Sequence, residues 1–231
     1  MAGRPSRGAR KMSKPAVLLT LAALVAAGLG LWASQRVYGP AEERAAPAVP
    51  ATRVATVLPT PRSVPAFELQ QSDGTPLTQD ELKGHWTVVF LGFTHCPDIC
   101  PTTLAQLAAA QKQWASIPQA HRPRVLFISA DPERDSPEQT GRYAHAFHPE
   151  TLAATAPVPQ LERFARSLSL VFMKVPGASG EPRDYSIDHS AALVLLDPQG
   201  RLGGVIQPPF DISAVAADVA LLAETSAGAA R

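Results

Sequence analysis

The spacing of apolar residues changes several times along the chain, and each spacing is typical of one kind of element. Apolar and polar residues alternate over 67–70, and the turn residues Ser72-Asp73-Gly74 follow, so a short β-hairpin is predicted there. Nearly uninterrupted apolar runs over 86–93 and 124–130 predict strands buried on both faces. The remaining patterns predict helices over 101–116, 138–147, 160–168 and 211–223, strands over 171–175, 191–197 and 202–207, and a segment 185–188 that leads into the strand at 191.

The order of these elements predicts an α/β fold built in layers. A strand, a helix and a second buried strand come first, which is typical of a right-handed parallel crossover. A hairpin of two strands and a last helix end the chain. This order is the thioredoxin-like arrangement, a central mixed sheet flanked by helices. The only two cysteines, Cys96 and Cys100, fall where the strand at 86–93 passes into the first long helix.

The first part of the chain is unlike the rest. Residues 16–33 form an uncharged, almost entirely apolar run, which is about the length that a membrane-spanning helix needs. We expect a cytoplasmic basic segment at 1–15, a single transmembrane anchor at 16–33, a Pro/Ala-rich tether at 34–63 and the folded domain at 64–231. A cleaved secretory signal is the alternative interpretation. Either interpretation places the domain outside the cytoplasm, in a bacterial periplasm beyond the inner membrane or in an equivalent space.

Charge and cysteine content exclude two classes of protein. The net charge is +1, but five basic residues lie among the first fourteen, so the remainder carries −4. A basic surface for nucleic acid is therefore not expected. Two cysteines cannot build a secreted scaffold of several disulfides, so the domain must rely on an apolar core.

The cysteine pair is the first candidate for chemistry. Cys96 and Cys100 can form a local disulfide, exchange electrons with another thiol pair, or hold a soft metal ion. At the start of a helix, unpaired N–H groups and the helix dipole favour a thiolate, so we expect a lowered thiol pKa. Three residues separate the two cysteines, one more than in redox C-x-x-C motifs, which allows both sulfurs to face one ion.

His189 is the candidate for a third ligand. It directly precedes the buried strand at 191–197, and in a thioredoxin-like fold the loop before that strand faces the cysteine loop. Two thiolates and one imidazole suit Cu(I), and suit Cu(II) with a further ligand, whereas structural zinc normally takes four protein ligands. Asp98 and Asp188 could orient these ligands, or could be a helix-start charge and a turn residue.

The other five histidines are weaker candidates for the site. His95 is adjacent to Cys96, but neighbouring side chains need not face the same way. The remaining four lie in polar or amphipathic stretches, and we interpret them as solvated surface residues: His85, His121, His145 and His148.

Three sequence blocks together resemble the Sco/SenC family of membrane-anchored copper chaperones. They are Gly92-Phe93-Thr94-His95-Cys96-Pro97-Asp98-Ile99-Cys100-Pro101, then Asp131-Pro132-Glu133-Arg134-Asp135 with Pro137, and Asp188-His189-Ser190. The resemblance covers the chain from about Val64 to the last helix. It implies that Cys96, Cys100 and His189 bind one copper ion, Cu(I) or Cu(II), per chain.

The resemblance also implies a role and partners. The role is delivery of copper to the dinuclear copper centre in subunit II of cytochrome c oxidase, with other periplasmic copper carriers or thiol reductants as further partners. A thiol–disulfide oxidoreductase that keeps the partner's cysteines reduced is the alternative function. It needs both sulfurs but not the histidine. A thioredoxin-like peroxidase acting through Cys96 is a third class, in which the histidine would have no role.

Overall fold

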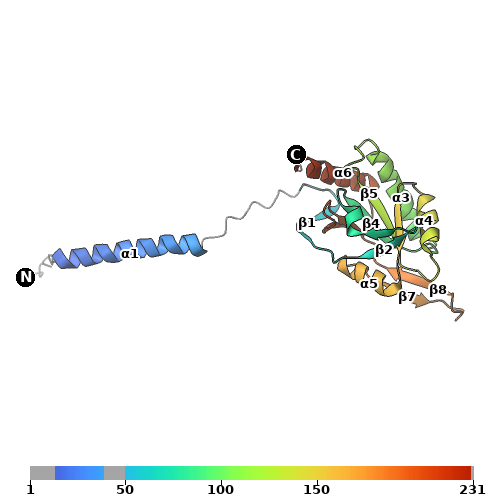
Figure 1. Ribbon diagram of the computed structural model, residues 1–231, viewed down its shortest axis with the longest axis horizontal. Coiled ribbons are helices and arrows are strands. Elements are labelled where there is room, and N and C mark those ends of the chain that lie inside the picture. Colours follow the sequence, from blue (N-terminus) through green and yellow to red (C-terminus); the bar gives the residue numbers. More distant parts are fainter. Residues whose placement is uncertain (1–13, 39–49, 230–231) are drawn as a thin grey trace, which may run out of the picture. The chain divides into compact units, whose positions relative to one another are not determined.

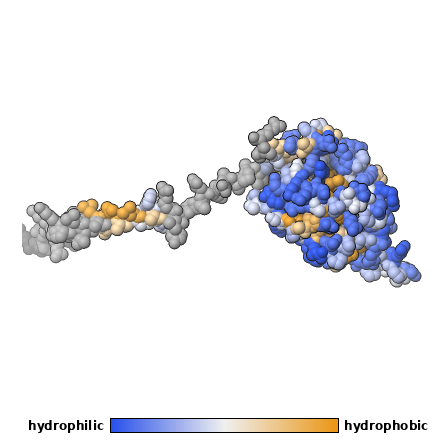
Figure 2. All heavy atoms as spheres, viewed as in Figure 1, coloured by the Kyte–Doolittle hydropathy of each residue, from blue (hydrophilic) through white to orange (hydrophobic). Residues whose placement is uncertain are grey.

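The computed structural model describes residues 14–38 and 50–229. The chain divides into two units, one within residues 1–47 and the other within residues 48–231. The first unit contains helix α1 (Lys14–Tyr38; Figure 1), and Figure 2 shows hydrophobic residues on its surface. Leu24 and Leu31 are among its exposed apolar side chains. Over the residues that the structure describes, no helix combines the length and the apolar character needed to cross a membrane. The expected basic segment lies almost wholly outside the described residues.

The second unit is built on an eight-stranded mixed sheet in the order β1-β10-β9-β4-β5-β6-β2-β3 (Figure 1). Strands β4, β5 and β6 are parallel, and β9 runs antiparallel to β4. The strands of the sheet are β1 (Ala55–Arg62), β2 (Glu68–Gln71), β3 (Pro76–Thr78), β4 (Thr87–Gly92), β5 (Arg124–Ser129), β6 (Leu152–Thr155), β9 (Leu193–Leu196) and β10 (Leu202–Ile206).

Helices surround the sheet, and a separate two-stranded ribbon extends at one end of the domain (Figure 1). The helices are α2 (Gln79–Leu82), α3 (Ile99–Trp114), α4 (Pro137–His145), α5 (Val158–Ser167) and α6 (Ile212–Ala229), and the ribbon pairs β7 (Phe172–Pro176) with β8 (Tyr185–His189).

The core lies on both faces of the central strands. Every residue of β4 is buried, because helices cover a parallel strand on each side. Helices α3 and α6 pack against each other, and the indole of Trp114 donates a hydrogen bond to the carbonyl of Ala216 at 2.9 Å. This packing fixes the helix that carries Cys100 relative to the sheet.

Most of the predicted elements are confirmed. The structure contains the β2–β3 hairpin and the parallel β4–α3–β5 unit, and its sheet is mixed, as in thioredoxin-like folds. Helix α3 begins at Ile99 rather than at 101, because Pro101 fits within the first turn, where its missing N–H has no partner to lose. Residues 185–189 form strand β8 of the ribbon rather than an extension of the next strand.

Two strands were not predicted. Residues 55–62, expected in the tether, form β1 and pair with β10, so the folded unit begins upstream of the expected boundary at 64. Its prolines are tolerated because β1 is the edge strand of the sheet. Strand β6 is short and alanine-rich, and alanine has little preference for strands, so its pattern gives no signal.

Candidate metal site

The two cysteines lie at the junction of β4 and α3, as expected. Cys96 is in the connecting loop and partly exposed, and Cys100 is in the first turn of α3 and fully buried. Both are free thiols. The backbone N–H of Cys100 donates to the Cys96 sulfur at 3.3 Å, so the loop turns both side chains toward the same end of the sheet.

His189 ends strand β8, and its ring lies edge-on to two phenylalanines, Phe90 in strand β4 and Phe93 directly after that strand. Its centroid is 6.2 Å from that of Phe90 and 6.1 Å from that of Phe93. Nδ1 lies 3.1 Å from the Ser190 carbonyl, which can only accept, so Nδ1 carries the proton in this contact. Nε2 therefore presents its lone pair, 3.6 Å from the Cys100 sulfur. Metal-bound histidines commonly have such a partner for the second ring nitrogen.

These distances fit a shared metal ion for two of the three donors. Ligand bonds of about 2.0–2.3 Å allow two donors of one ion to lie up to about 4.5 Å apart. Cys100 Sγ and His189 Nε2, at 3.6 Å, meet that limit. Cys96 and His189 both line a hollow of about 270 Å³. The three donor atoms do not all lie within 4.8 Å of one another, so binding one ion through all three requires a side chain to move.

Burial sets the protonation of the two inner donors. It raises the pKa of the Cys100 thiol well above its usual range, chiefly by desolvating the thiolate. The expectation of a lowered pKa is therefore wrong for Cys100, because desolvation exceeds the effect of the helix start. Burial also lowers the pKa of His189, which leaves the imidazole neutral and able to bind a metal.

Neither aspartate proposed to orient ligands makes a side-chain hydrogen bond to Cys96, Cys100 or His189 in the part of the chain that the structure describes. Asp98 is exposed at the position before α3 and makes no side-chain cap bond. Asp188 is exposed at the rim of the hollow, where its charge is a minor influence that raises the pKa of His189. The group that orients the His189 ring is the Ser190 carbonyl, which sequence reasoning cannot distinguish from any other carbonyl.

Asp135 is a functional candidate that sequence reasoning missed. It is fully buried, and its carboxylate accepts hydrogen bonds from the N–H of Thr94 at 2.8 Å and the hydroxyl of Thr94 at 2.6 Å. His95 contacts this carboxylate through Nδ1 at 3.2 Å. In the sequence, Asp135 is included only as part of the block Asp131–Asp135 that resembles the family, because nothing in the sequence separates it from the two other acids of that block.

One further histidine departs from expectation. His85 is buried rather than solvated, and its Nδ1 lies 2.9 Å from the Arg122 carbonyl. It lies before strand β4, at the end opposite the cysteine loop, and belongs to the packing between strand ends. Desolvation lowers its pKa.

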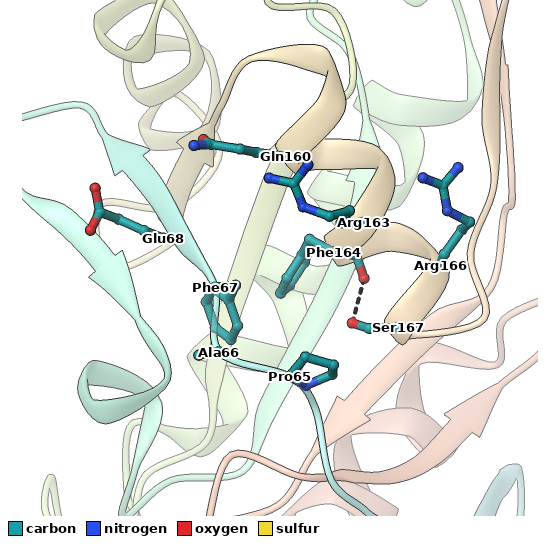
Figure 3. A pocket seen from close by; sticks show the side chains of 9 residues that line it. All are labelled: Pro65, Ala66, Phe67, Glu68, Gln160, Arg163, Phe164, Arg166 and Ser167. Atoms are coloured by element: carbon teal, nitrogen blue, oxygen red, sulfur yellow. Dashed lines mark hydrogen bonds between the residues drawn. The ribbon is translucent and has the colours of Figure 1, made fainter.

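A larger cavity, of about 490 Å³, lies between the segment at 65–68 and helix α5 (Figure 3). Figure 3 shows the rings of Phe67 and Phe164 together, with centroids 4.6 Å apart, and the Ser167 hydroxyl bonded to the Phe164 carbonyl. Among the described residues that line it, none is a cysteine or a histidine. The smaller hollow beside Cys96 is therefore the one with soft-metal donors.

The chain is similar in sequence to a known protein family. The SCO1/SenC family model matches residues 56–224. The mitochondrial SCO1 homolog 1 of Arabidopsis thaliana is 39% identical over 136 residues, which are 58% of this chain and 39% of that protein.

Two solved structures are close in fold. The crystal structure of Arabidopsis thaliana ScoI with copper bound has a TM-score of 0.64 and 33% identity, covering 70% of this chain and 98% of that one. Apo Sco1 from Thermus thermophilus has a TM-score of 0.65 and 32% identity, covering 75% of this chain and 99% of that one. With a family model matched over most of its length, the chain belongs to the SCO1/SenC family.

Proposed function

We propose that this protein is a copper metallochaperone that holds one copper ion through Cys96, Cys100 and His189 and passes it to a partner protein. The observation that carries the proposal is the 3.6 Å approach of a buried thiol to the free nitrogen of a neutral imidazole. Two sulfurs and one nitrogen form a donor set that prefers copper to harder cations. The copper-bound Arabidopsis relative, at 33% identity, supports the choice of metal.

The different exposure of the two cysteines suggests how the cargo moves. Cys100 is fully buried and is not among the residues that line the hollow, whereas Cys96 is partly exposed and lines it. A ligand of a docked partner can therefore replace Cys96 before it replaces Cys100 or His189. Binding displaces the proton of the Cys100 thiol, and the raised pKa of that thiol means that release to a partner is assisted by reprotonation.

Family membership supports the choice of partner. We place this chain in assembly of the dinuclear copper centre in subunit II of cytochrome c oxidase, with other periplasmic copper carriers as donors. For location we propose a single-pass anchor at 16–33 in the inner membrane with the domain in the periplasm, supported by the apolar run and the basic residues before it. Full-length protein is expected to stay in the membrane fraction after alkaline washing, and its release would contradict the anchor.

Copper binding by ligand variants tests the proposal. Reduced full-length protein is expected to retain one copper per chain against a competing chelator, and Cys96→Ser and His189→Ala are each expected to lose tight binding. His121→Ala, which removes an exposed histidine elsewhere, is the matched control. One tightly held copper in the Cys96→Ser or His189→Ala variant would refute the proposed site.

A thiol–disulfide oxidoreductase is the second candidate, favoured by two reduced thiols of which one is accessible. In that reaction Cys96 and Cys100 are oxidised to a disulfide while a disulfide of the partner is reduced to two thiols. The two functions differ in their need for the imidazole. Reductase turnover unaffected by His189→Ala, together with unchanged copper binding in the same variant, would favour the oxidoreductase.

A further inference from the structure

The copper donors of the proposed site lie on two segments that are distant in sequence. The cysteines lie at the junction of β4 and α3, whereas His189 ends a ribbon whose two strands pair only with each other. An isolated two-stranded ribbon is marginally stable in water, so another part of the domain must hold it in place. The loop Asp131–Asp135, between β5 and α4, contacts both segments.

On the ribbon side, the contacts converge on Tyr185, the first residue of β8. Its buried hydroxyl donates to Asp131 Oδ1 at 2.8 Å. Arg134 donates to the Tyr185 carbonyl at 3.0 Å, and its guanidinium lies 3.6 Å from the centroid of the tyrosine ring. A third contact joins Lys174 of β7 to Glu133 at 2.7 Å. The start of strand β8, where it pairs with the end of β7, is thereby fixed to the loop by hydrogen bonds, stacking and an ion pair.

The loop Asp131–Asp135 also holds Thr94, which lies two positions before Cys96. The carboxylate of Asp135 accepts both the N–H and the hydroxyl of Thr94. Within the loop, the N–H of Asp135 donates to the Asp131 carbonyl at 2.8 Å, so the two points of attachment belong to one hydrogen-bonded turn. The loop thus sets the distance between the segment Thr94–Cys100, which carries both cysteines, and the ribbon.

We infer that Tyr185 is a positioning residue for copper binding, which fixes β8 so that the His189 nitrogen stays over the Cys100 sulfur. This inference rests on the proposed function. Alternate residues of a strand face the same side, and Tyr185, Ile187 and His189 share the inward face of β8. A displacement of Tyr185 therefore moves His189 along with it. Tyr185 acts through strand β8, because it touches neither the His189 nitrogen nor the Cys100 sulfur.

Removing one hydroxyl tests the inference. In the full-length protein, Tyr185→Phe keeps the ring but deletes the bond to Asp131, and we expect copper affinity to fall about tenfold, as for other residues that orient metal ligands. Tyr143→Phe is the matched control, because its buried hydroxyl has no hydrogen-bond partner. Arg134→Lys, which loses the planar group stacked on Tyr185, is a second variant with the same expectation.

A double variant separates positioning from general stability. If Tyr185 acts through His189, adding Tyr185→Phe to His189→Ala causes no further loss of copper affinity, and the nitrogen coupling in the electron paramagnetic resonance spectrum of the Cu(II) form is weakened in Tyr185→Phe alone. Equal losses in both backgrounds would overturn the inference and leave the proposed function intact. Unchanged affinity in His189→Ala would overturn the proposed function, and the inference with it.

Discussion

At the scale of single residues, Gly92 determines whether Cys100 can occupy its position. A Cβ at Gly92 would lie 2.9 Å from the Cys100 sulfur and 3.0 Å from the ring of Phe127. Gly92→Ala is expected to displace the sulfur, to destabilise the domain by about 1–3 kcal/mol through overpacking, and to weaken copper binding. Chelator competition and denaturant unfolding measure the two effects.

The control for this substitution is Gly228→Ala, where an added methyl group meets no atom within 4 Å. It should leave copper affinity unchanged. A Gly92→Ala protein with wild-type copper affinity would show that the sulfur has room that the structure does not provide.

Residue types and the order of elements predict Cys96, Cys100 and His189 as ligands, and the structure brings the side chains of Cys100 and His189 together. Protonation could not be predicted in the same way. The helix start favours a thiolate, but the pKa of Cys100 depends on the surrounding core, which only the folded chain reveals. The burial of His85 against a carbonyl likewise has no periodic signal.

At the scale of elements, the start of strand β1 depends on one acid of helix α6. The buried carboxylate of Asp218 accepts the backbone N–H groups of Arg53, Val54 and Ala55 at 2.8–2.9 Å. Asp218→Asn removes the negative charge and replaces one of the two accepting oxygens with an amide donor, and we expect a loss of about 2–4 kcal/mol of unfolding free energy.

Urea unfolding measures this loss. Asp80→Asn, at an exposed ion pair with Lys83, is the control and should change the free energy of unfolding by less than about 1 kcal/mol. Equal stability of the Asp218→Asn and Asp80→Asn proteins would contradict the role assigned to Asp218.

Elements with a strong pattern of their own were predictable, and elements defined by a partner were not. The buried strands β4 and β5 contain long apolar runs, so their positions followed from the sequence. Strand β1 contains two prolines and resembles a tether until its pairing with β10 is seen. The ribbon strand β8 looked like the beginning of the next strand, because only its pairing with β7 separates them.

At the scale of the whole molecule, a buried histidine, His85, and a half-buried one, His189, make stability depend on pH. Burial lowers the pKa of His85 and of His189, so at mildly acidic pH the unfolded chain binds protons that the folded chain does not. Unfolding free energy in the absence of copper is therefore expected to fall as the pH decreases from about 6.5, the ordinary histidine value. The full contribution is present above that pH.

Denaturant unfolding at pH 7.5 and pH 5.5 measures this dependence. His85→Gln, which cannot be protonated, is expected to lose less stability between the two pH values than the wild type does. The exposed-site variant His145→Gln is the control and should follow the wild type. Identical pH dependence of the wild-type and His85→Gln proteins would rule out a contribution from His85.

X-ray absorption of the copper-loaded, reduced full-length chain tests the central claim most directly, because it counts the atoms bonded to the metal. The account predicts two sulfur ligands and one imidazole nitrogen in the wild type, two sulfurs without the imidazole in His189→Ala, and one sulfur with the imidazole in Cys96→Ser. A wild-type spectrum without an imidazole ligand, or with a single sulfur, would contradict the convergence of Cys96, Cys100 and His189 on one copper ion.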